Sequence, residues 1–368
     1  DLHEPYRRQR QMCIRDSKLI MDKMAKTLVF TGERQIELRE YPIPEVSDNK
    51  VLVKVDACAI CTWEQRVYTG VKKVEYPFIG GHEMVGKIIK MGKNVDRRQW
   101  SEGDFVAVGV TLPCKNCYQC KSGNEQNCEH FDHSKQQEGL PEKGMGGMSS
   151  HLLVSPDNLF HISNVSPEEA TITEPLSCVL HSVETAQIEF GDVVVVIGCG
   201  IMGLLHTLLS IRRGACVIVS DTNEERTKLA LELGASYAVN PAKENLEEKV
   251  KEITGGIKAQ VVFDTTPISA VAEDAVKSVA NNGRLVLYSS FYPDTPISIS
   301  PDWLHKSAAK LLGTANSNTV DFTKATRLLS QGIIDVKPFV SEVYELEEYK
   351  QAFESAIKGD KFRVVIKF

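Results

Sequence analysis

The chain has 368 residues, of which 42% are hydrophobic and 25% charged, and it carries a net charge of −6 at pH 7. These values are typical of a soluble globular protein with two domains. The acidic balance argues against a nucleic-acid partner, which would need a basic surface, and no apolar run is long enough to cross a membrane.

Residues 1–23 differ from the rest of the chain. The stretch DLHEPYRRQRQMCIRDS is polar and basic, shows neither helical nor strand periodicity, and lacks the apolar centre of a secretory signal. We expect residues 1–23 to be non-native sequence or a disordered tail, with the natural start at Met21 or Met24. A short basic tail is the alternative.

The region from Lys26 to about Val154 contains short β-prone runs separated by glycine, proline and asparagine. The runs are TLVF, VLVKVDACAI, MVGKIIKMG, DFVAVGV and SHLLV. This pattern predicts a mostly antiparallel, barrel-like domain that is interrupted by a cysteine-rich loop.

Within that region, Gly81-His82-Glu83 precedes the cysteines by about 30 residues. Imidazole and carboxylate are zinc ligands, and a set of one cysteine, one histidine and one carboxylate leaves a fourth position open. The motif therefore predicts a catalytic zinc site.

Four cysteines of the loop follow the spacing C-x2-C-x2-C-x7-C: Cys114, Cys117, Cys120 and Cys128. Zinc binds four thiolates in a closed tetrahedron, so the spacing predicts a structural zinc site. A disulfide pair or a zinc ribbon that binds nucleic acid is the alternative. Clustered cysteines of this type favour a reducing cytoplasm over secretion. His130 and His133 follow in a polar loop and are expected to be solvated.

Residues 166–188 are helical in character, and Ser166, Pro167 and Glu169 supply an N-terminal signal. The pattern then changes to apolar strand-like runs, DVVVVIG, CVIVSD, QVVFDTT and RLVLYSS, which alternate with helical stretches such as ERTKLALELGA and AVAEDAVKSVAN. Strands that alternate with helices predict a doubly wound parallel sheet.

A glycine-rich motif follows the first of these strands and opens a helix: Gly198, Cys199, Gly200, Ile201, Met202 and Gly203. In this setting the motif predicts a dinucleotide site. Gly198 permits the tight turn, Gly200 lets the backbone approach the pyrophosphate, and Gly203 allows close packing of helix and strand. The helix N-terminus, with Ile201 and Met202, receives the negative charge.

Asp221 ends the next strand, about 20 residues further on. Its carboxylate would bind the adenosine ribose and repel a 2′-phosphate, which favours NAD over NADP. A structural acid at a strand end is the alternative. Arg226 either packs on the adenine or is a solvated helix charge.

The tail from Phe322 to Phe368 contains two amphipathic helices and a last strand, RVVIKF. We expect it to fold back onto the first domain. The predicted domains are 24–176 with 320–368, and 177–319.

The order of zinc motif, cysteine loop and glycine motif resembles the zinc-dependent medium-chain alcohol dehydrogenases, from about Lys26 to Phe368. The most specific part of the resemblance is Gly81-His82-Glu83-x2-Gly86-x5-Gly92-x2-Val95. It implies a GroES-like β-barrel catalytic domain followed by a Rossmann NAD-binding domain.

The resemblance also implies a ligand set for the catalytic zinc. Cys61 occupies the place of the family's first ligand, with Cys58 as the competing choice, and His82 supplies imidazole. Glu83 is implied as a direct ligand or as a group behind the ligands. Glu174 begins a Glu-Pro-Leu segment similar to that of sorbitol and threonine dehydrogenases, where the glutamate binds zinc or holds the zinc-bound water.

The sequence departs from the family after Cys61. Trp63 stands where relatives have the serine or threonine that begins the proton relay, and Arg66 stands at the histidine position. Thr62 is one candidate for the relay, and a zinc-bound water passed by Glu174 is the other. For Trp63 three roles are open: it narrows the substrate pocket, it stacks on a substrate, or it packs against neighbouring side chains at the domain interface.

The predicted function is an NAD-dependent zinc dehydrogenase that oxidises a small secondary alcohol, a polyol or sugar alcohol, with one catalytic and one structural zinc. L-threonine and 2,3-butanediol are the alternative substrates. A catalytically inactive protein that binds NAD and zinc is a third hypothesis. By resemblance we expect a cytoplasmic homodimer or homotetramer without a membrane or nucleic-acid partner.

Overall fold

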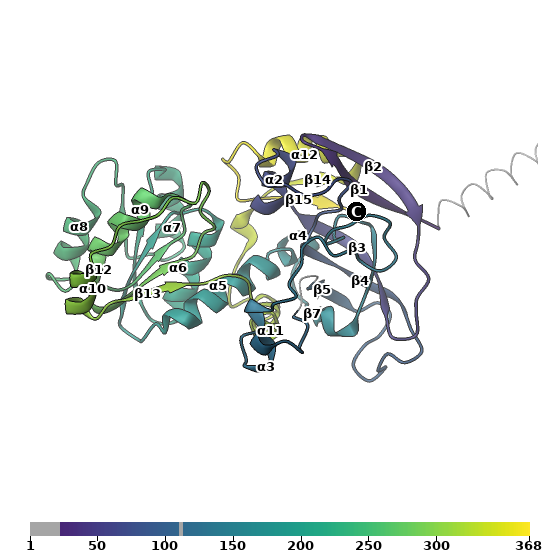
Figure 1. Ribbon diagram of the computed structural model, residues 1–368, viewed down its shortest axis with the longest axis horizontal. Helices are drawn as coiled ribbons and strands as arrows, with labels where there is room; N and C mark the ends of the chain where they lie inside the picture. The colour runs from purple at the N-terminus through teal and green to yellow at the C-terminus, as the bar shows by residue number, and fades with distance from the viewer. Residues whose placement is uncertain (1–22, 110–112) are drawn as a thin grey trace, which may run out of the picture. The chain divides into compact units, whose positions relative to one another are not determined.

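The structure, a computed structural model, describes residues 23–109 and 113–368 and divides into two compact units (Figure 1). Unit 1 comprises the described residues up to Gly109 together with Asp132–Ile172 and Val336–Phe368. Unit 2 comprises Pro113–Phe131 and Thr173–Asp335. Apart from Lys23, the predicted non-native or disordered segment lies outside the described residues.

The boundaries of the two units differ from those of our predicted domains, which we placed after residue 176 and before residue 320. Helix α11 (Thr319–Ser330) belongs to unit 2, because it packs against α5 (Thr173–Ala186). The cysteine loop also belongs to unit 2. An amphipathic pattern predicts that a helix buries one face, but it does not identify the core against which that face packs.

Unit 1 is built on a mostly antiparallel sheet of seven strands in the order β14-β15-β3-β4-β5-β7, with β6 paired to β3. β14 and β15 are parallel, and both come from the C-terminal tail, which returns to this unit. β1 and β2 form a separate antiparallel pair. The strands are β1 Met24–Gly32, β2 Gln35–Pro42, β3 Val51–Ala59, β4 Glu83–Met91, β5 Phe105–Val108, β6 His151–Val154, β7 Leu159–His161, β14 Val340–Glu345 and β15 Arg363–Lys367.

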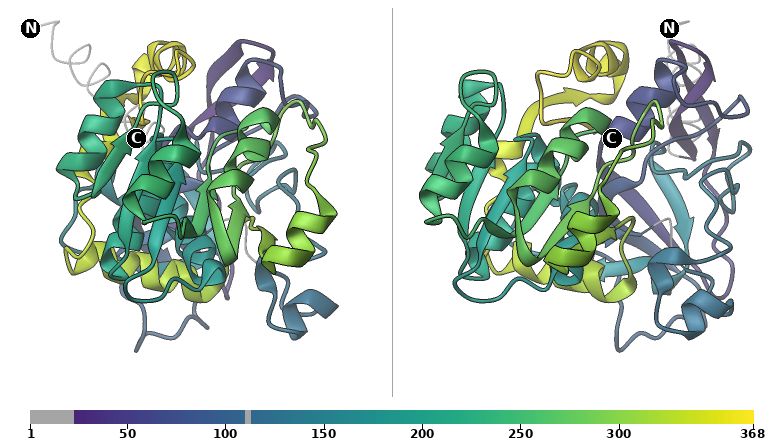
Figure 2. Two further views of the ribbon diagram at one scale, coloured as in Figure 1. Left: turned by 90° about the vertical axis from the view of Figure 1, so that its left-hand side faces the viewer. Right: turned by 60° about the vertical axis from the view of Figure 1, so that its left-hand side comes forward.

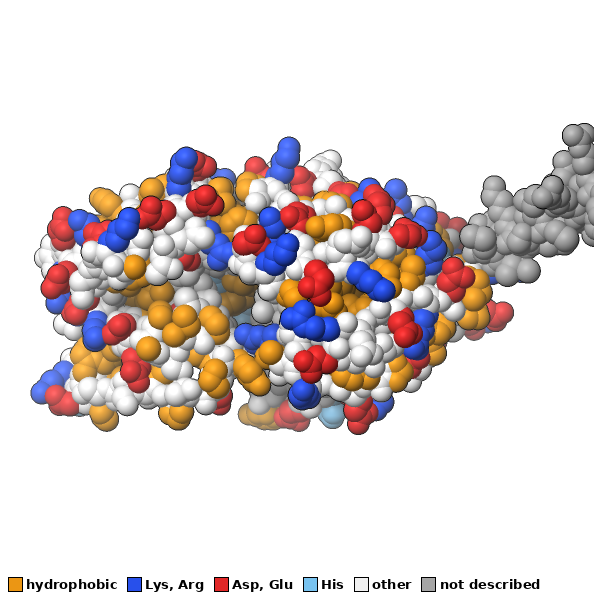
Figure 3. All heavy atoms as spheres, turned by 90° about the horizontal axis from the view of Figure 1, so that it is seen from above, with side chains coloured by type: hydrophobic (Ala, Val, Ile, Leu, Met, Phe, Trp, Pro, Cys, Tyr) orange, Lys and Arg blue, Asp and Glu red, His pale blue; other side chains and the backbone are white. Residues whose placement is uncertain are grey.

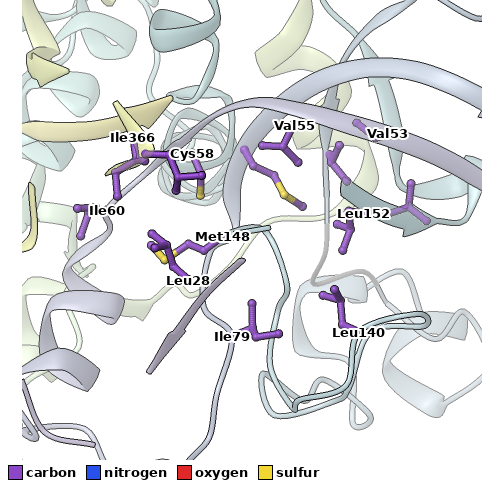
Figure 4. Close-up of a cluster of buried hydrophobic side chains, with 14 of the residues drawn as sticks. Leu28, Val53, Val55, Cys58, Ile60, Ile79, Leu140, Met148, Leu152 and Ile366 are labelled. Atoms are coloured by element: carbon purple, nitrogen blue, oxygen red, sulfur yellow. The ribbon is translucent and has the colours of Figure 1, made fainter. Parts of the chain in front are cut away.

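The core of unit 1 joins the first strands to the last. Figure 4 shows Leu28 of β1, Cys58 of β3 and Ile366 of β15 in one buried cluster. Phe30 of β1 packs edge-on against Phe353 of the C-terminal helix α12, with ring centroids 5.4 Å apart. β3 is part of this core, and the candidate metal site begins where β3 ends.

The helices of unit 1 are short: α2 Thr62–Tyr68, α4 Pro167–Ala170 and α12 Tyr349–Ala356, with single 3-10 turns at Pro156–Asn158, Lys337–Phe339 and Leu346–Glu348. Ser166 caps α4 as predicted, since its hydroxyl accepts a bond from the Glu169 backbone N–H and its own N–H donates to the Glu169 carboxylate. The predicted helical character of residues 166–188 is confirmed, but the segment is divided into two helices, α4 and α5. Pro175 is the third residue of α5, and proline is tolerated only in the first turn of a helix.

Unit 2 contains a six-stranded parallel sheet in the order β10-β9-β8-β11-β12-β13, with helices on both faces (Figure 2). This order is that of the doubly wound dinucleotide-binding fold. The strands are β8 Val193–Ile197, β9 Cys216–Ser220, β10 Tyr237–Val239, β11 Ala259–Asp264, β12 Val279–Leu287 and β13 Lys310–Gly313. The helices are α3 Tyr118–Lys121, α5, α6 Ile201–Arg212, α7 Glu224–Glu232, α8 Leu246–Ile253, α9 Ser269–Ala275, α10 Pro301–Ser307 and α11, with 3-10 turns at Glu125–Asn127 and Val276–Ser278.

The predicted helix over AVAEDAVKSVAN ends earlier than expected. α9 stops at Ala275, and after one 3-10 turn the chain enters β12 at Val279. Val279 is buried and pairs with Ala259 of β11. Pairing within the sheet thus places in a strand apolar residues that the local sequence pattern assigns to a helix.

The surface carries mixed charge. Acidic and basic side chains are interspersed over the face shown in Figure 3. A helix with the length and apolar character of a membrane span does not occur among the described residues.

Two glycines fix the turn between β8 and α6. Gly198 has a φ of +92°, which a side chain would strain. A Cβ on Gly203 would clash with the Gly198 carbonyl oxygen and lie 3.0 Å from Thr265 Oγ1. Gly200 has a φ of −70° and open space around its Cβ position. Gly198 and Gly203 are therefore needed for folding and Gly200 is not.

Substitution of these glycines separates packing from ligand binding. We expect Gly203→Ala to lower the free energy of unfolding by about 1–3 kcal/mol, because helix and strand must move apart. The matched variant Gly200→Ala keeps the melting temperature but weakens dinucleotide binding. Thermal melts and fluorescence titrations with NADH measure both effects, and equal melting temperatures for the two variants would contradict this account.

His206 of α6 is fully buried, and each nitrogen of its ring has a polar contact. Its Nδ1 lies 2.8 Å from the Met202 carbonyl oxygen, and its Nε2 lies 2.9 Å from Ser182 Oγ. Burial lowers the pKa of this imidazole to about 4. The folded chain therefore holds His206 neutral.

This burial gives unit 2 a defined pH dependence. As the pH falls from about 6.5 toward 4, the unfolded chain binds a proton at residue 206 and the folded chain does not, so stability decreases. We expect His206→Gln to flatten this dependence by about 1.4 kcal/mol per pH unit at its steepest. Urea unfolding between pH 4 and 7 tests it, with the exposed His305→Gln as control. A slope that stays the same in His206→Gln would refute the assignment.

Candidate active site

The candidate metal site starts at the junction of β3 and α2. Cys61 is the N-cap of α2, and Thr62 and Glu64 follow in its first turn. Thr62 is exposed, whereas Glu64 is fully buried. The turn therefore directs a thiol and a carboxylate inward from neighbouring positions.

Glu64 orients the histidine of the motif. Its Oε1 lies 2.8 Å from His82 Nδ1 and accepts a bond from the Gly81 N–H at 3.0 Å. A hydrogen bond at Nδ1 leaves Nε2 of the imidazole for a metal and sets the tautomer. The contact of Glu64 with His82 was not predicted from the sequence.

Glu83, the first residue of β4, forms a buried ion pair with Arg363, the first residue of β15. Arg363 donates from Nε to Oε2 and from Nη2 to Oε1, both at 2.8 Å. The side chains are 4% and 0% exposed. Sequence reasoning missed Arg363, because 280 residues separate the partners and local spacing carries no signal of their contact.

Cys61, His82 and Glu83 form a possible metal-binding group, in which the ligand atoms lie within 4.8 Å of one another. Arg363 Nη2 also lies 3.8 Å from Cys61 Sγ. Burial and the nearby Glu83 raise the pKa of the Cys61 thiol, so metal binding here releases a proton. Sulfur, nitrogen and oxygen donors in one buried group fit an open zinc site.

The four cysteines of the loop also meet: Cys114, Cys117, Cys120 and Cys128. Neighbouring sulfurs are 3.4 to 4.0 Å apart. Tetrahedral zinc with bonds of about 2.3 Å requires sulfurs about 3.8 Å apart. Backbone N–H groups of Asn116 and Cys117 lower the pKa of the Cys114 thiol to about 5. The group fits a structural zinc.

His130 is exposed as expected, but its Nδ1 lies 3.2 Å from Cys114 Sγ. The prediction that His133 is solvated is wrong. His133 is partly buried, and its ring stacks on Trp63 with centroids 5.4 Å apart. The polar sequence around His133 gave no sign of this contact, which joins segments 70 residues apart along the chain.

The cysteine loop is tied to the segment that precedes α11 and to the first residue of that helix. Asn316 Nδ2 donates to the Gln126 carbonyl at 3.0 Å, and Thr319 Oγ1 donates to Glu125 Oε2 at 3.1 Å. From the same segment, Ser317 Oγ lies 2.8 Å from Ser177 Oγ of α5. These bonds explain why the loop belongs to unit 2.

The glycine turn has the form of a phosphate-binding site. Gly200 is the N-cap of the 12-residue helix α6 and offers no side-chain cap, so the first N–H groups are available to a ligand. Thr265 Oγ1 donates to the Ile197 and Gly198 carbonyls at 2.8 and 3.1 Å and holds the turn. Burial raises the pKa of the Cys199 thiol to about 12, which keeps it protonated.

Asp221 lies one residue beyond β9, at the expected position. Its Oδ2 accepts a bond from the Cys199 N–H at 2.6 Å, and its Oδ1 accepts from the Asn223 N–H at 2.8 Å. The carboxylate is thus placed beside the glycine turn. Arg226 lies in the first turn of α7, where its backbone N–H donates to Asn223 Oδ1.

Glu174 belongs to unit 2, whereas Cys61, His82 and Glu83 belong to unit 1. It occupies the first turn of α5, and its Oε1 accepts a bond from Cys178 Sγ at 3.3 Å. The role of Glu174 as a zinc ligand therefore stays a prediction.

The fold and the two cysteine-containing groups define a class. Residues 47–164 match the alcohol dehydrogenase GroES-like domain, and residues 202–331 match the zinc-binding dehydrogenase domain. Together these matches cover more than half of the chain. The chain belongs to the zinc-binding alcohol dehydrogenase family and is an oxidoreductase.

Individual relatives show which members the chain resembles. It is 29% identical to the sorbitol dehydrogenase of Bacillus subtilis over 93% of this chain and 96% of that protein. It is also 29% identical to an L-threonine 3-dehydrogenase of Bacillus licheniformis, over 94% and 99%. A zinc-binding dehydrogenase from Sinorhizobium meliloti, solved with NADP, matches with a TM-score of 0.85 and 24% identity over 94% of this chain and 99% of that chain, which shows the shared fold.

The Glu83–Arg363 pair predicts that a single substitution lowers the free energy of unfolding much more than the substitution of both residues. In metal-free protein, Arg363→Met leaves Glu83 buried and unpaired, and we expect a loss of about 3–5 kcal/mol in the free energy of unfolding. Adding Glu83→Gln to Arg363→Met recovers most of this loss. Urea unfolding measures it, with Arg98→Met of the exposed Arg98–Asp96 pair as control. An equal cost at positions 98 and 363 would argue against charge burial.

Proposed function

We propose that this enzyme oxidises a polyol or sugar alcohol at a secondary hydroxyl, with zinc and NAD. The observation that carries the proposal is the group of Cys61, His82 and Glu83, in which a thiol and an imidazole can bind zinc and the carboxylate lies beside them. The glycine turn with Asp221 supports the choice of cofactor. The similarity to sorbitol dehydrogenase supports the substrate class.

When bound, zinc supplies Lewis-acid polarisation of an alcohol oxygen, and NAD supplies the hydride acceptor. The chain supplies position and charge. Glu64 fixes the direction of the His82 ring, and Arg363 balances the charge of Glu83. This arrangement holds negatively charged ligands in a buried site without an unpaired charge.

The remaining site assignments are also proposals. Both carboxylate oxygens of Glu83 accept bonds from Arg363, which favours a role behind the ligands over direct coordination. Glu174 then supplies the third protein ligand or holds the zinc-bound water. Exposed Thr62 next to Cys61 is the candidate for the proton relay.

NAD is favoured over NADP by the carboxylate of Asp221, which would repel a 2′-phosphate. Its backbone bonds to Cys199 and Asn223 hold it in place beside the turn. Arg226 is proposed to pack on the adenine. L-threonine and 2,3-butanediol remain the alternative substrates of the same chemistry.

We also propose that the enzyme is a cytoplasmic homodimer or homotetramer. β13 is an outer strand of the unit 2 sheet, and Leu311 on it is 38% exposed. An outer strand offers backbone groups for pairing with a second copy.

A substrate panel tests the proposal. Zinc-loaded protein is incubated with sorbitol, xylitol, galactitol, myo-inositol, 2,3-butanediol and L-threonine, each with NAD and NADP. We expect NADH formation on a polyol and a loss of at least about 100-fold in kcat/KM for Cys61→Ser, because a metal ligand is removed.

The buried Cys58→Ser is the matched control, and we expect it to retain activity and both zinc ions. Activity restricted to threonine or butanediol would change the substrate and leave the chemistry. A preference for NADP would refute the role of Asp221. Two zinc ions with no turnover on any alcohol would refute the proposed function.

A further inference from the structure

Trp63 lies between residues that belong to the candidate metal site. It is the second residue of α2, between the candidate ligand Cys61 and Glu64, which orients His82. Any group that Trp63 binds is therefore held close to the groups that hold the metal.

The indole ring is fixed by neighbours on several sides. His133 stacks on it at an interplanar angle of 18°, and Phe78 lies 5.6 Å away by ring centroid. The His82 ring stands edge-on to it at 6.4 Å, and Lys72 Nζ lies 5.4 Å from its centroid. Because all of these groups contact one ring, its N–H points in a set direction.

That N–H has no acceptor among the described residues, although it is shielded from solvent. An indole nitrogen is a donor only, and a buried unpaired donor costs about 1–3 kcal/mol. A phenylalanine would fill similar space without this cost. The choice of tryptophan is explained if a group from outside the protein accepts the bond.

The surroundings define the kind of acceptor. The stacked ring of His133 does not accept a bond from this N–H, so the acceptor is an oxygen atom from outside the described residues. A neutral hydroxyl oxygen fits a single N–H donor of an uncharged ring. The ligand that enters beside His82 is the alcohol substrate, and its reacting hydroxyl is committed to the metal.

We propose that Trp63 Nε1–H donates a hydrogen bond to the hydroxyl on the carbon next to the reacting carbon, and so selects vicinal diols over simple secondary alcohols. This inference rests on the proposed function and names the substrate feature that the site recognises. His133 is a positioning residue, because its stacked ring holds the indole in place.

The test compares 2,3-butanediol with 2-butanol, which differ by the second hydroxyl. Trp63→Phe keeps an aromatic ring and removes the donor. We expect its kcat/KM for the diol to fall about tenfold, the size of one hydrogen bond to a neutral group, while the value for 2-butanol changes less than about twofold. Incorporation of 3-benzothienylalanine at position 63 preserves the shape of indole without the N–H, and is expected to give the same selective loss.

Trp303→Phe, in α10 of unit 2, is the control for a general effect of replacing tryptophan. An equal loss for both alcohols in Trp63→Phe, or no loss for either, would overturn the proposal; the second result would indicate that water accepts the bond. Loss of the diol preference in Trp303→Phe would overturn it as well.

Binding measurements keep this test separate from the proposed function. Ligand-observed NMR titrations give the dissociation constants of both alcohols from the zinc-loaded protein without turnover. We expect the diol to bind about tenfold more weakly to Trp63→Phe than to the unsubstituted protein, with 2-butanol unchanged. If no alcohol is oxidised but this selective loss appears, the subsite stands and the proposed function fails. Equal binding constants for the two proteins would remove the subsite.

Discussion

Charge balance in a dry interior is the constraint on which the candidate metal site depends. Zinc ligands are thiolate, imidazole and carboxylate, and burial penalises each negative charge that is not paired. Arg363 meets this constraint by holding Glu83 with two hydrogen bonds while one of its nitrogens lies 3.8 Å from Cys61 Sγ. One guanidinium therefore serves both a carboxylate and a thiol. The seven-stranded sheet places it there, since β15 pairs with β3 and β3 with β4.

The first turn of α2 concentrates three tasks in neighbouring residues. Cys61 presents sulfur, Glu64 directs His82, and Trp63 offers a shielded N–H. The turn itself is positioned by the buried end of β3, where the Ile60 N–H donates to the Val364 carbonyl at 2.9 Å. Metal binding and the proposed substrate recognition thus share a single support, and a substitution that shifts this turn alters both.

Local motifs were readable from the sequence, and distant contacts were not. The cysteine spacing of residues 114–128 and the glycine turn at 198–203 each lie within one loop, where spacing alone constrains geometry. The parallel sheet followed from the alternation of strands and helices. The contact of Arg363 with Glu83 and the stacking of His133 on Trp63 depend on the tertiary fold. The extent of unit 2 was missed for the same reason, because α11 packs on α5.

Arg363 follows every residue of unit 2 along the chain, and this order has a consequence for biosynthesis. A ribosome makes β15 only after all the residues of unit 2. Unit 2 contains no residue after Asp335, so its parallel sheet is free to fold while the chain is still being made. Unit 1 lacks both its edge pair β14-β15 and the counter-ion of Glu83 until residues 340–367 emerge. A nascent or prematurely terminated chain would thus carry a dinucleotide-binding fold before it has a competent metal site.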